Sequence, residues 1–159
     1  MKTLISPAEV PALVFGTSTT LRAEDIPLQT ILAAERRYIQ PVVGKTLYEE
    51  LTAPAPSHTL TLFTEEYLKM PLALYVVSLL LPTIATQVGA AGVVRISGGS
   101  FEAVNERTLQ RLRRRLRTDA DTLLDRATSH LAANPNLFPS YNPQENIRER
   151  ISVKGGVVL

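Results

Sequence analysis

The chain has 159 residues, a length at which one hydrophobic core normally suffices, so a single domain is expected. Hydrophobic residues make up 45% of it and charged residues 20%, a balance that excludes a disordered polymer. The absence of cysteine excludes disulfides, thiolate catalysis and cysteine metal sites, and it suits a reducing cytoplasm. The net charge of +2 is too small by itself to indicate a polyanionic partner.

The N-terminal residues predict a short helix followed by a loop. No apolar run follows Met1, so no signal peptide is expected. Ser6-Pro7-Ala8-Glu9 has the form of a capping box with proline at the first helical position. Because Pro11 follows so closely, only a turn or two of helix is expected, and residues 12–20 predict a loop.

Two helices are expected between residues 25 and 51. The first runs from about Asp25 or Pro27 to Ile39 and is stopped by Pro41. Its apolar stripe comprises Leu28, Ile31, Leu32, Tyr38 and Ile39, whereas Glu35, Arg36 and Arg37 are expected to face water. The second helix follows Gly44 and spans Lys45 to Leu51, with Leu47, Tyr48 and Leu51 on its inner side.

The most apolar stretch follows a proline-rich loop at residues 52–59. Thr64 is the expected N-cap of the next helix, which Pro71 breaks or restarts. Residues 71–88 then predict a core helix kinked at Pro82. The 25 residues from Met70 to Val94 carry no charge and are long enough to span a bilayer, but their prolines, glycines and hydroxyl groups favour a buried helix over a transmembrane one.

The C-terminal half predicts a hairpin, a long helix and a tail. Residues 93–104 predict a β-hairpin around Ser97-Gly98-Gly99-Ser100, which needs a surface to lean on because two strands alone are barely stable. A helix of about residues 105–133 follows, capped by Asn105, with apolar positions Leu109, Leu112, Leu116, Leu123, Ala127 and Leu131. Asn134-Pro135 ends it, Phe138–Tyr141 predicts a clasp against the core, and residues 143–159 predict an extended tail.

Side chains with catalytic or ligating potential are sparse. His58 lies in a loop and His130 near a helix end, where the helix dipole favours it. Asp121 and Asp125 lie one turn apart and could hold a cation, but pairing of Arg117 with Asp121 and of Arg115 with Asp119 is the commoner arrangement. No phosphate loop, dinucleotide fingerprint or nucleophile elbow is present. The sequence therefore predicts neither an enzyme nor a cofactor or metal site.

An arginine run is the strongest local feature. Within 11 residues it contains Arg107, Arg111, Arg113, Arg114, Arg115 and Arg117. On a helix these side chains cover most of the circumference and spare the leucine stripe. The run is compatible with a solvated exterior, with phosphate contact and with a charged subunit interface. No aromatic residue is interleaved, which argues against base stacking or sequence readout.

Two segments resemble the head–tail connector proteins of tailed bacteriophages, also termed adaptor or head-completion proteins. Residues 33–51, AAERRYIQPVVGKTLYEEL, are similar to the family's helix, Ile-x-Pro-x-x-Gly turn and Leu-Tyr-x-x-Leu helix. Residues 134–141, NPNLFPSY, are similar to its Asn-x-x-x-Phe/Tyr-Pro-x-Tyr ending. The resemblance covers roughly residues 20–142 and does not extend to the Pro11–Thr20 loop.

The predicted elements give a mainly helical domain over residues 1–142, a small bundle around a central apolar helix with one β-hairpin, and the resemblance likewise implies a helical subunit. It implies a virion structural protein, assembled in the host cytoplasm, that forms a ring in the phage neck, twelvefold in this picture, below the portal protein. Its partners would be further copies of itself, the portal, the next tail or neck protein, and DNA that passes through without sequence readout, with no membrane. The six arginines would face the DNA channel or a subunit interface.

The tail, residues 143–159, is expected to be a docking arm on the portal or a neighbouring copy. Its candidate docking residues are Val153, Lys154, Gly155, Gly156, Val157, Val158 and Leu159, two extended pieces joined by a glycine pair. A frayed terminus is the alternative. For the whole chain, the rival hypotheses are a small sequence-independent nucleic-acid-binding helical protein and a membrane-anchored protein.

Overall fold

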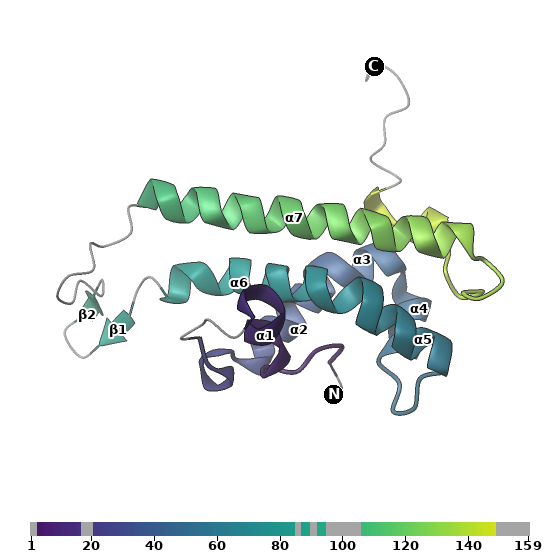
Figure 1. Cartoon of the computed structure of the whole chain (residues 1–159), viewed down its shortest axis with the longest axis horizontal. Coiled ribbons are helices and arrows are strands. Elements are labelled where there is room, and N and C mark those ends of the chain that lie inside the picture. Colours follow the sequence, from purple (N-terminus) through teal and green to yellow (C-terminus); the bar gives the residue numbers. More distant parts are fainter. Residues whose placement is uncertain (1–2, 17–20, 85–86, 90–91, 95–105, 149–159) are drawn as a thin grey trace, which may run out of the picture.

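The computed structural model describes residues 3–16, 21–84, 87–89, 92–94 and 106–148, and it is mainly helical, as predicted. Its helices are α1 (Glu9–Phe15), α2 (Leu28–Ala34), α3 (Gln40–Val43), α4 (Lys45–Leu51), α5 (His58–Phe63), α6 (Lys69–Ile84) and α7 (Glu106–Ala133). Short 3-10 turns, η1 (Ala23–Asp25) and η4 (Pro143–Glu145), and two π-helical turns, η2 (Glu35–Ile39) and η3 (Thr64–Leu68), complete the helical part. In Figure 1, α7 lies along one side of the molecule, antiparallel to α6, and α1 and α2 lie toward the other side of α6.

Helix α6 is the centre of the core, as predicted. Every side chain from Pro71 to Ser78 is buried, and Leu80 is 3% exposed. Ser78 Oγ, the aliphatic hydroxyl group in that stretch, donates to the carbonyl of Tyr75 (2.8 Å) and so needs no water. No helix in the described part of the chain is both long and apolar enough to cross a membrane.

Pro41 and Pro71, predicted to stop or break helices, lie inside continuous helical segments. A proline ring clashes with the carbonyl of the residue four positions earlier, here Arg37 and Tyr67. Both of these residues lie in a π turn, η2 or η3, in which Gln40 N–H bonds Glu35 O and Lys69 N–H bonds Thr64 O. The wider turn accommodates the ring, so the helix continues. It runs from Leu28 to Val43 in one case and from His58 to Ile84 in the other.

Several helix boundaries also differ from the predictions. Helix α1 reaches Phe15, because Pro11 falls in its first turn, where a missing N–H has no partner to lose. Helix α5 begins at His58 rather than after Thr64, because Ser57 Oγ caps it by accepting from Leu60 N (3.3 Å). Helix α6 ends at Ile84, two residues after Pro82 and four before the expected end.

The predicted 93–104 hairpin is not supported. Two short strands, β1 (Gln87–Gly89) and β2 (Gly92–Val94), pair antiparallel further upstream, with Val88 opposite Val93. The apolar periodicity had assigned Val88 to the core helix. Because α6 ends at Ile84, Val88 lies in a strand instead. Residues 95–104 and the expected cap Asn105 lie outside the described residues.

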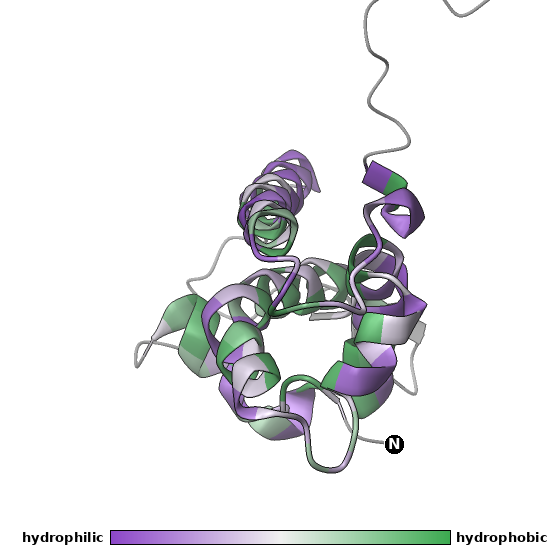
Figure 2. Cartoon of the chain, turned by 90° about the vertical axis from the view of Figure 1, so that its right-hand side faces the viewer, coloured by the Kyte–Doolittle hydropathy of each residue, from purple (hydrophilic) through white to green (hydrophobic). Residues whose placement is uncertain are grey.

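Helix α7 matches its predicted extent but packs along only part of its length. Its buried positions are Leu116, Ala120, Leu124, Ala127 and Leu131, at spacings of three and four residues. Leu109 is half-buried and Leu112 is 44% exposed, so the predicted apolar stripe leaves the core toward the N-terminal end. Figure 2, in which the right-hand side of Figure 1 faces the viewer, shows green residues on facing sides of the helices and purple on the far part of α7.

Because Leu80 is in the core, Leu80→Ala should lower the free energy of unfolding by about 2–5 kcal/mol through lost burial and a residual cavity. Leu28→Ala is the matched control, and it should change stability by less than about 0.5 kcal/mol because the side chain is 45% exposed. Chemical denaturation of both variants measures the difference. Equal effects would show that α6 is not the core.

Candidate functional site

The first three turns of α7 form a strongly basic surface, which we call the basic segment (residues 106–118). It contains six arginines and one glutamate, a formal charge of +5 in a chain whose net charge is +2. Arg107, Arg111, Arg114 and Arg115 are exposed. Arg115 lies 3.8 Å from Asp119, the predicted pair, and this contact contributes little because both groups are solvated.

The other two arginines turn toward the body of the molecule. Arg113 and Arg117 are half-buried, and the guanidinium of Arg117 lies 5.9 Å from the centre of the Tyr38 ring. Arg37 approaches the same ring at 5.5 Å, and Tyr38 stacks on Tyr75 with ring centres 4.1 Å apart. No aromatic residue lies within the arginine run itself. Its aromatic neighbour, Tyr38, comes from η2, about eighty residues away in the chain.

An ion-pair network next to the basic segment holds the C-terminal residues. Arg148 binds Asp121 and Asp125, the second at 2.5 Å, and donates to the Tyr75 hydroxyl at 3.0 Å. The Tyr75 hydroxyl in turn donates to Asp121. Burial and this bond to Asp121 raise the pKa of Tyr75, which keeps its phenol a donor.

This network corrects one sequence-based prediction and shows what the two aspartates bind. Asp121 pairs with Arg148 instead of Arg117, and the two aspartates that could have held a cation hold a guanidinium. In the described residues no group of three or more histidine, aspartate or glutamate side chains could bind a metal ion. The pairing was not predictable from helical spacing, because Arg148 lies 23 and 27 residues along the chain from its partners.

Residues 146 and 148, which were expected to be part of the extended tail, contact the helical part of the chain. Asn146 is 1% exposed, donates to the Tyr141 hydroxyl (3.2 Å) and accepts from the Arg148 N–H (3.0 Å). The predicted clasp is present, with Phe138 and Tyr141 buried. The candidate docking residues Val153 to Leu159 lie outside the described residues.

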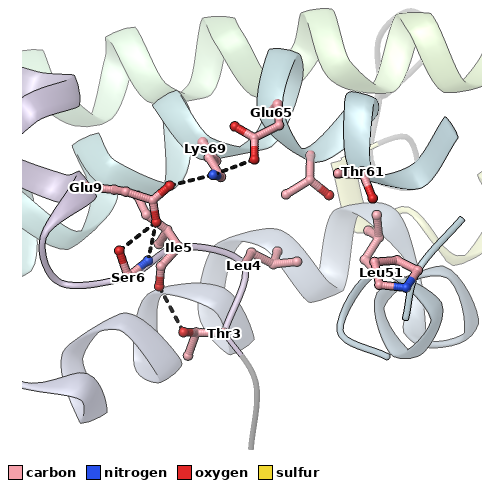
Figure 3. Close-up of a pocket in the computed structure, with 11 residues that line it drawn as sticks. Thr3, Leu4, Ile5, Ser6, Glu9, Leu51, Thr61, Glu65 and Lys69 are labelled. Carbon is pink, nitrogen blue, oxygen red and sulfur yellow. Dashed lines mark hydrogen bonds and ion pairs between the residues drawn. The ribbon is translucent and has the colours of Figure 1, made fainter. Parts of the chain in front are cut away.

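A pocket of about 400 Å³ lies between the N-terminal segment and α5–α6 (Figure 3). Lys69 crosses it, with its ammonium 2.5 Å from Glu9 and 2.6 Å from Glu65. Burial acts to raise the pKa of Glu9, but hydrogen bonds from Lys69 and Ser6 outweigh it and bring the pKa to about 2. Glu9 also accepts from the Ser6 backbone N–H at 2.7 Å, as the capping box predicts, so these groups serve to fix the chain entry into α1.

Glu35 was predicted to face water and is fully buried. Its position four residues after Ile31 puts it on the inner side of the helix. It accepts from the backbone N–H of Leu4 (2.7 Å) and from the Tyr48 hydroxyl (2.7 Å). Burial raises the pKa of Glu35 against the opposing effect of these bonds. The carboxyl group thus ties the N-terminal segment and α4 to η2, and its role is structural.

The opposite end of α7 contributes to an aromatic surface pocket of about 300 Å³, which we call the aromatic groove. Phe63, Tyr67, His130 and Phe138 stack or meet edge-on, and the rings of Tyr67 and His130 are 4.4 Å apart. Leu62 and Leu137 line it and are 45% and 55% exposed. His130, predicted to interact with the helix dipole, therefore also packs as an aromatic ring.

Residues 39–151 match a protein family described as a family of unknown function, DUF6712. The chain belongs to this family. The matched region includes the basic segment, the Arg148 network and the aromatic groove, and begins one residue after Tyr38. No curated protein and no solved structure matches the chain.

The Arg148 network predicts a sharp difference between two truncations. Removing residues 149–159 should leave thermal stability nearly unchanged, since the described anchors remain. Removing residues 146–159 should cost about 1–3 kcal/mol, because the buried Asn146 and the Arg148 hydrogen bonds are lost. Equal melting temperatures for the two truncated proteins would show that Arg148 does not hold this segment to α7.

Proposed function

We propose that the protein is a structural subunit of a phage head–tail connector, which assembles into a ring below the portal through which DNA passes. The proposed role is structural and not enzymatic. The observation that carries it is the basic segment: a helix end with +5 charge and an exposed leucine, on a body that otherwise has a complete core. Such a surface suits contact with phosphates or with other subunits.

The two segments that resemble connector proteins form one packing unit, which supports the proposal. Ser140 in the clasp donates to Glu50 at the end of α4 (2.5 Å). Gly44, in the turn before α4, has a φ of +86°, and a Cβ there would lie 3.0 Å from the Glu145 carboxylate. Glycine is favoured there by its backbone conformation, and the absence of a Cβ leaves room for the Glu145 side chain. The segment 33–51 thus meets the C-terminal part of the chain at two places, the end of α4 and the turn before α4.

Any DNA contact is proposed to be independent of sequence. The arginines of the basic segment bring no aromatic residue to an exposed surface, since Tyr38 is stacked on Tyr75. Guanidinium groups can then contact phosphates of any sequence, which suits a channel. Residues 149–159 are proposed as the arm that docks on the portal or a neighbouring copy, so the truncated protein that lacks them should fold and fail to join the assembly.

A test of this proposal is the mass of the purified protein and its change on charge reversal. Analytical ultracentrifugation should detect a ring-sized oligomer, and Arg111→Glu with Arg114→Glu should weaken DNA binding or assembly by about tenfold or more. Arg22→Glu with Lys45→Glu is the matched control, since it changes the net charge equally at exposed sites away from α7. It should have a much smaller effect.

The rival hypothesis gives a different result in the same experiments. A monomer that binds duplex DNA with a steep salt dependence would favour a small nucleic-acid-binding protein over a ring subunit. A strong preference for one duplex sequence at fixed salt would contradict sequence-independent DNA contact, which the ring subunit and the small nucleic-acid-binding protein both require.

A further inference from the structure

We propose that the aromatic groove of one copy receives the Leu112 side of the basic segment of a second copy, in a head-to-tail contact that repeats around the assembly. The inference rests on the proposed function, because it requires a chain that associates with itself. It goes further by assigning the two surfaces that meet.

The donor surface is an apolar ridge that leaves the core. Leu116 is 8% exposed, Leu109 is half-buried, and Leu112 between them is 44% exposed. These positions share one face of α7, so the ridge is continuous with the packed part of the helix. Arg111 and Arg115 flank Leu112 and are both exposed. A partner surface must therefore cover an apolar side chain and accept guanidinium groups beside it.

The aromatic groove has these two properties. Leu62 and Leu137 are the exposed apolar residues in its lining, and Phe63 and Phe138, each 2% exposed, are the buried ones. Glu66 also lines it, is exposed and has no ion pair with any residue that the structure describes. The guanidinium of Arg126 lies 5.3 Å from the centre of the Tyr67 ring and forms no ion pair with Glu66. The Glu66 carboxylate can therefore pair with an arginine of a second copy.

Charge favours this head-to-tail contact over a two-fold symmetric contact between two copies of the basic segment. A two-fold contact between two Leu112 ridges would bring two +5 segments together, and such like-charge juxtaposition is strongly unfavourable. The groove offers an apolar lining and a carboxylate instead. DNA would be attracted to the arginines but would leave the leucines of both surfaces uncovered.

The position of the two surfaces favours a repeating contact. The basic segment and the groove lie at opposite ends of the long axis, as α7 and α5 show in Figure 1. A contact between different surfaces of identical chains is heterologous, so it produces a closed ring when the rotation between neighbours permits closure. One pair of surfaces is then enough to build the whole assembly.

The absence of cysteine permits a direct test by cross-linking. We would combine two single-cysteine variants of the full chain, Leu112→Cys and Leu137→Cys, and join them with a short bismaleimide. Covalent dimers are expected in the mixture and not with either variant alone. A chain carrying both substitutions should give a ladder of covalent oligomers, whereas Thr122→Cys with Leu137→Cys, which uses an exposed position in the middle of α7, should not.

Leu137→Glu provides a second measurement that does not depend on cross-linking. It should leave the melting temperature of the unassociated chain at low concentration nearly unchanged, because the side chain is 55% exposed, and weaken self-association by about tenfold or more. Glu66→Arg should also weaken it, and Arg111→Glu in the same chain should partly restore it.

The outcomes separate this inference from the function on which it rests. An assembly of ring-like mass without cross-links between positions 112 and 137 would overturn the contact and leave the proposed function standing. Equally fast cross-linking of Leu112→Cys with itself would show a two-fold interface and overturn it too. A chain that stays monomeric at all concentrations would overturn both.

Discussion

The packing of α7 on α6 is the contact on which the rest of the structure depends. Helix α6 is apolar on nearly all sides, so it must be covered on all sides. Helix α7 buries no side chain before Leu116, because guanidinium groups are costly to bury without a paired anion and six of them lie between Arg107 and Arg117. The first three turns of α7 therefore remain largely unburied, and this electrostatic limit separates a packed end of the molecule from a basic one.

The polar contacts around this helix pair follow the same division. Tyr75 on α6 stacks on Tyr38 and bonds Asp121 and Arg148, so one side chain connects η2, α7 and the C-terminal segment. Arg117, nearer the N-terminal end of α7, lies against the Tyr38 ring of the stacked tyrosine pair. Asp121 and Asp125, nearer the C-terminal end of α7, form ion pairs with Arg148. The network thus marks the point at which α7 changes from a solvated basic helix to a packed one.

The sequence predicts elements well where one local signal dominates. Helix α4 and its three inward residues, the extent of α7, the core position of α6 and the clasp at Phe138 were all predicted from apolar periodicity and turn residues. The errors have physical causes outside that signal. Pro41 and Pro71 are tolerated because π turns precede them, and Glu35 was placed by its polarity although its spacing from Ile31 puts it inside.

The candidate site was only partly predictable for a similar reason. The arginine run was identified from the sequence, but its aromatic neighbour Tyr38 and the partner of Asp121 come from distant segments that no helical spacing connects. The aromatic groove was missed as well, because its rings come from α5, η3, α7 and the clasp, and each looks like an ordinary core residue in its own segment. The exposed leucines at its rim are distinguishable from core leucines only in the folded chain.

The central claim is that the basic end of α7 is completed by assembly. Hydrogen–deuterium exchange on the free and the assembled protein tests it most directly. Amides of residues 106–115 should exchange fast in the free chain and become protected on assembly, while those of α6 should be protected in both states. Equal protection of residues 106–115 in the two states would contradict the account.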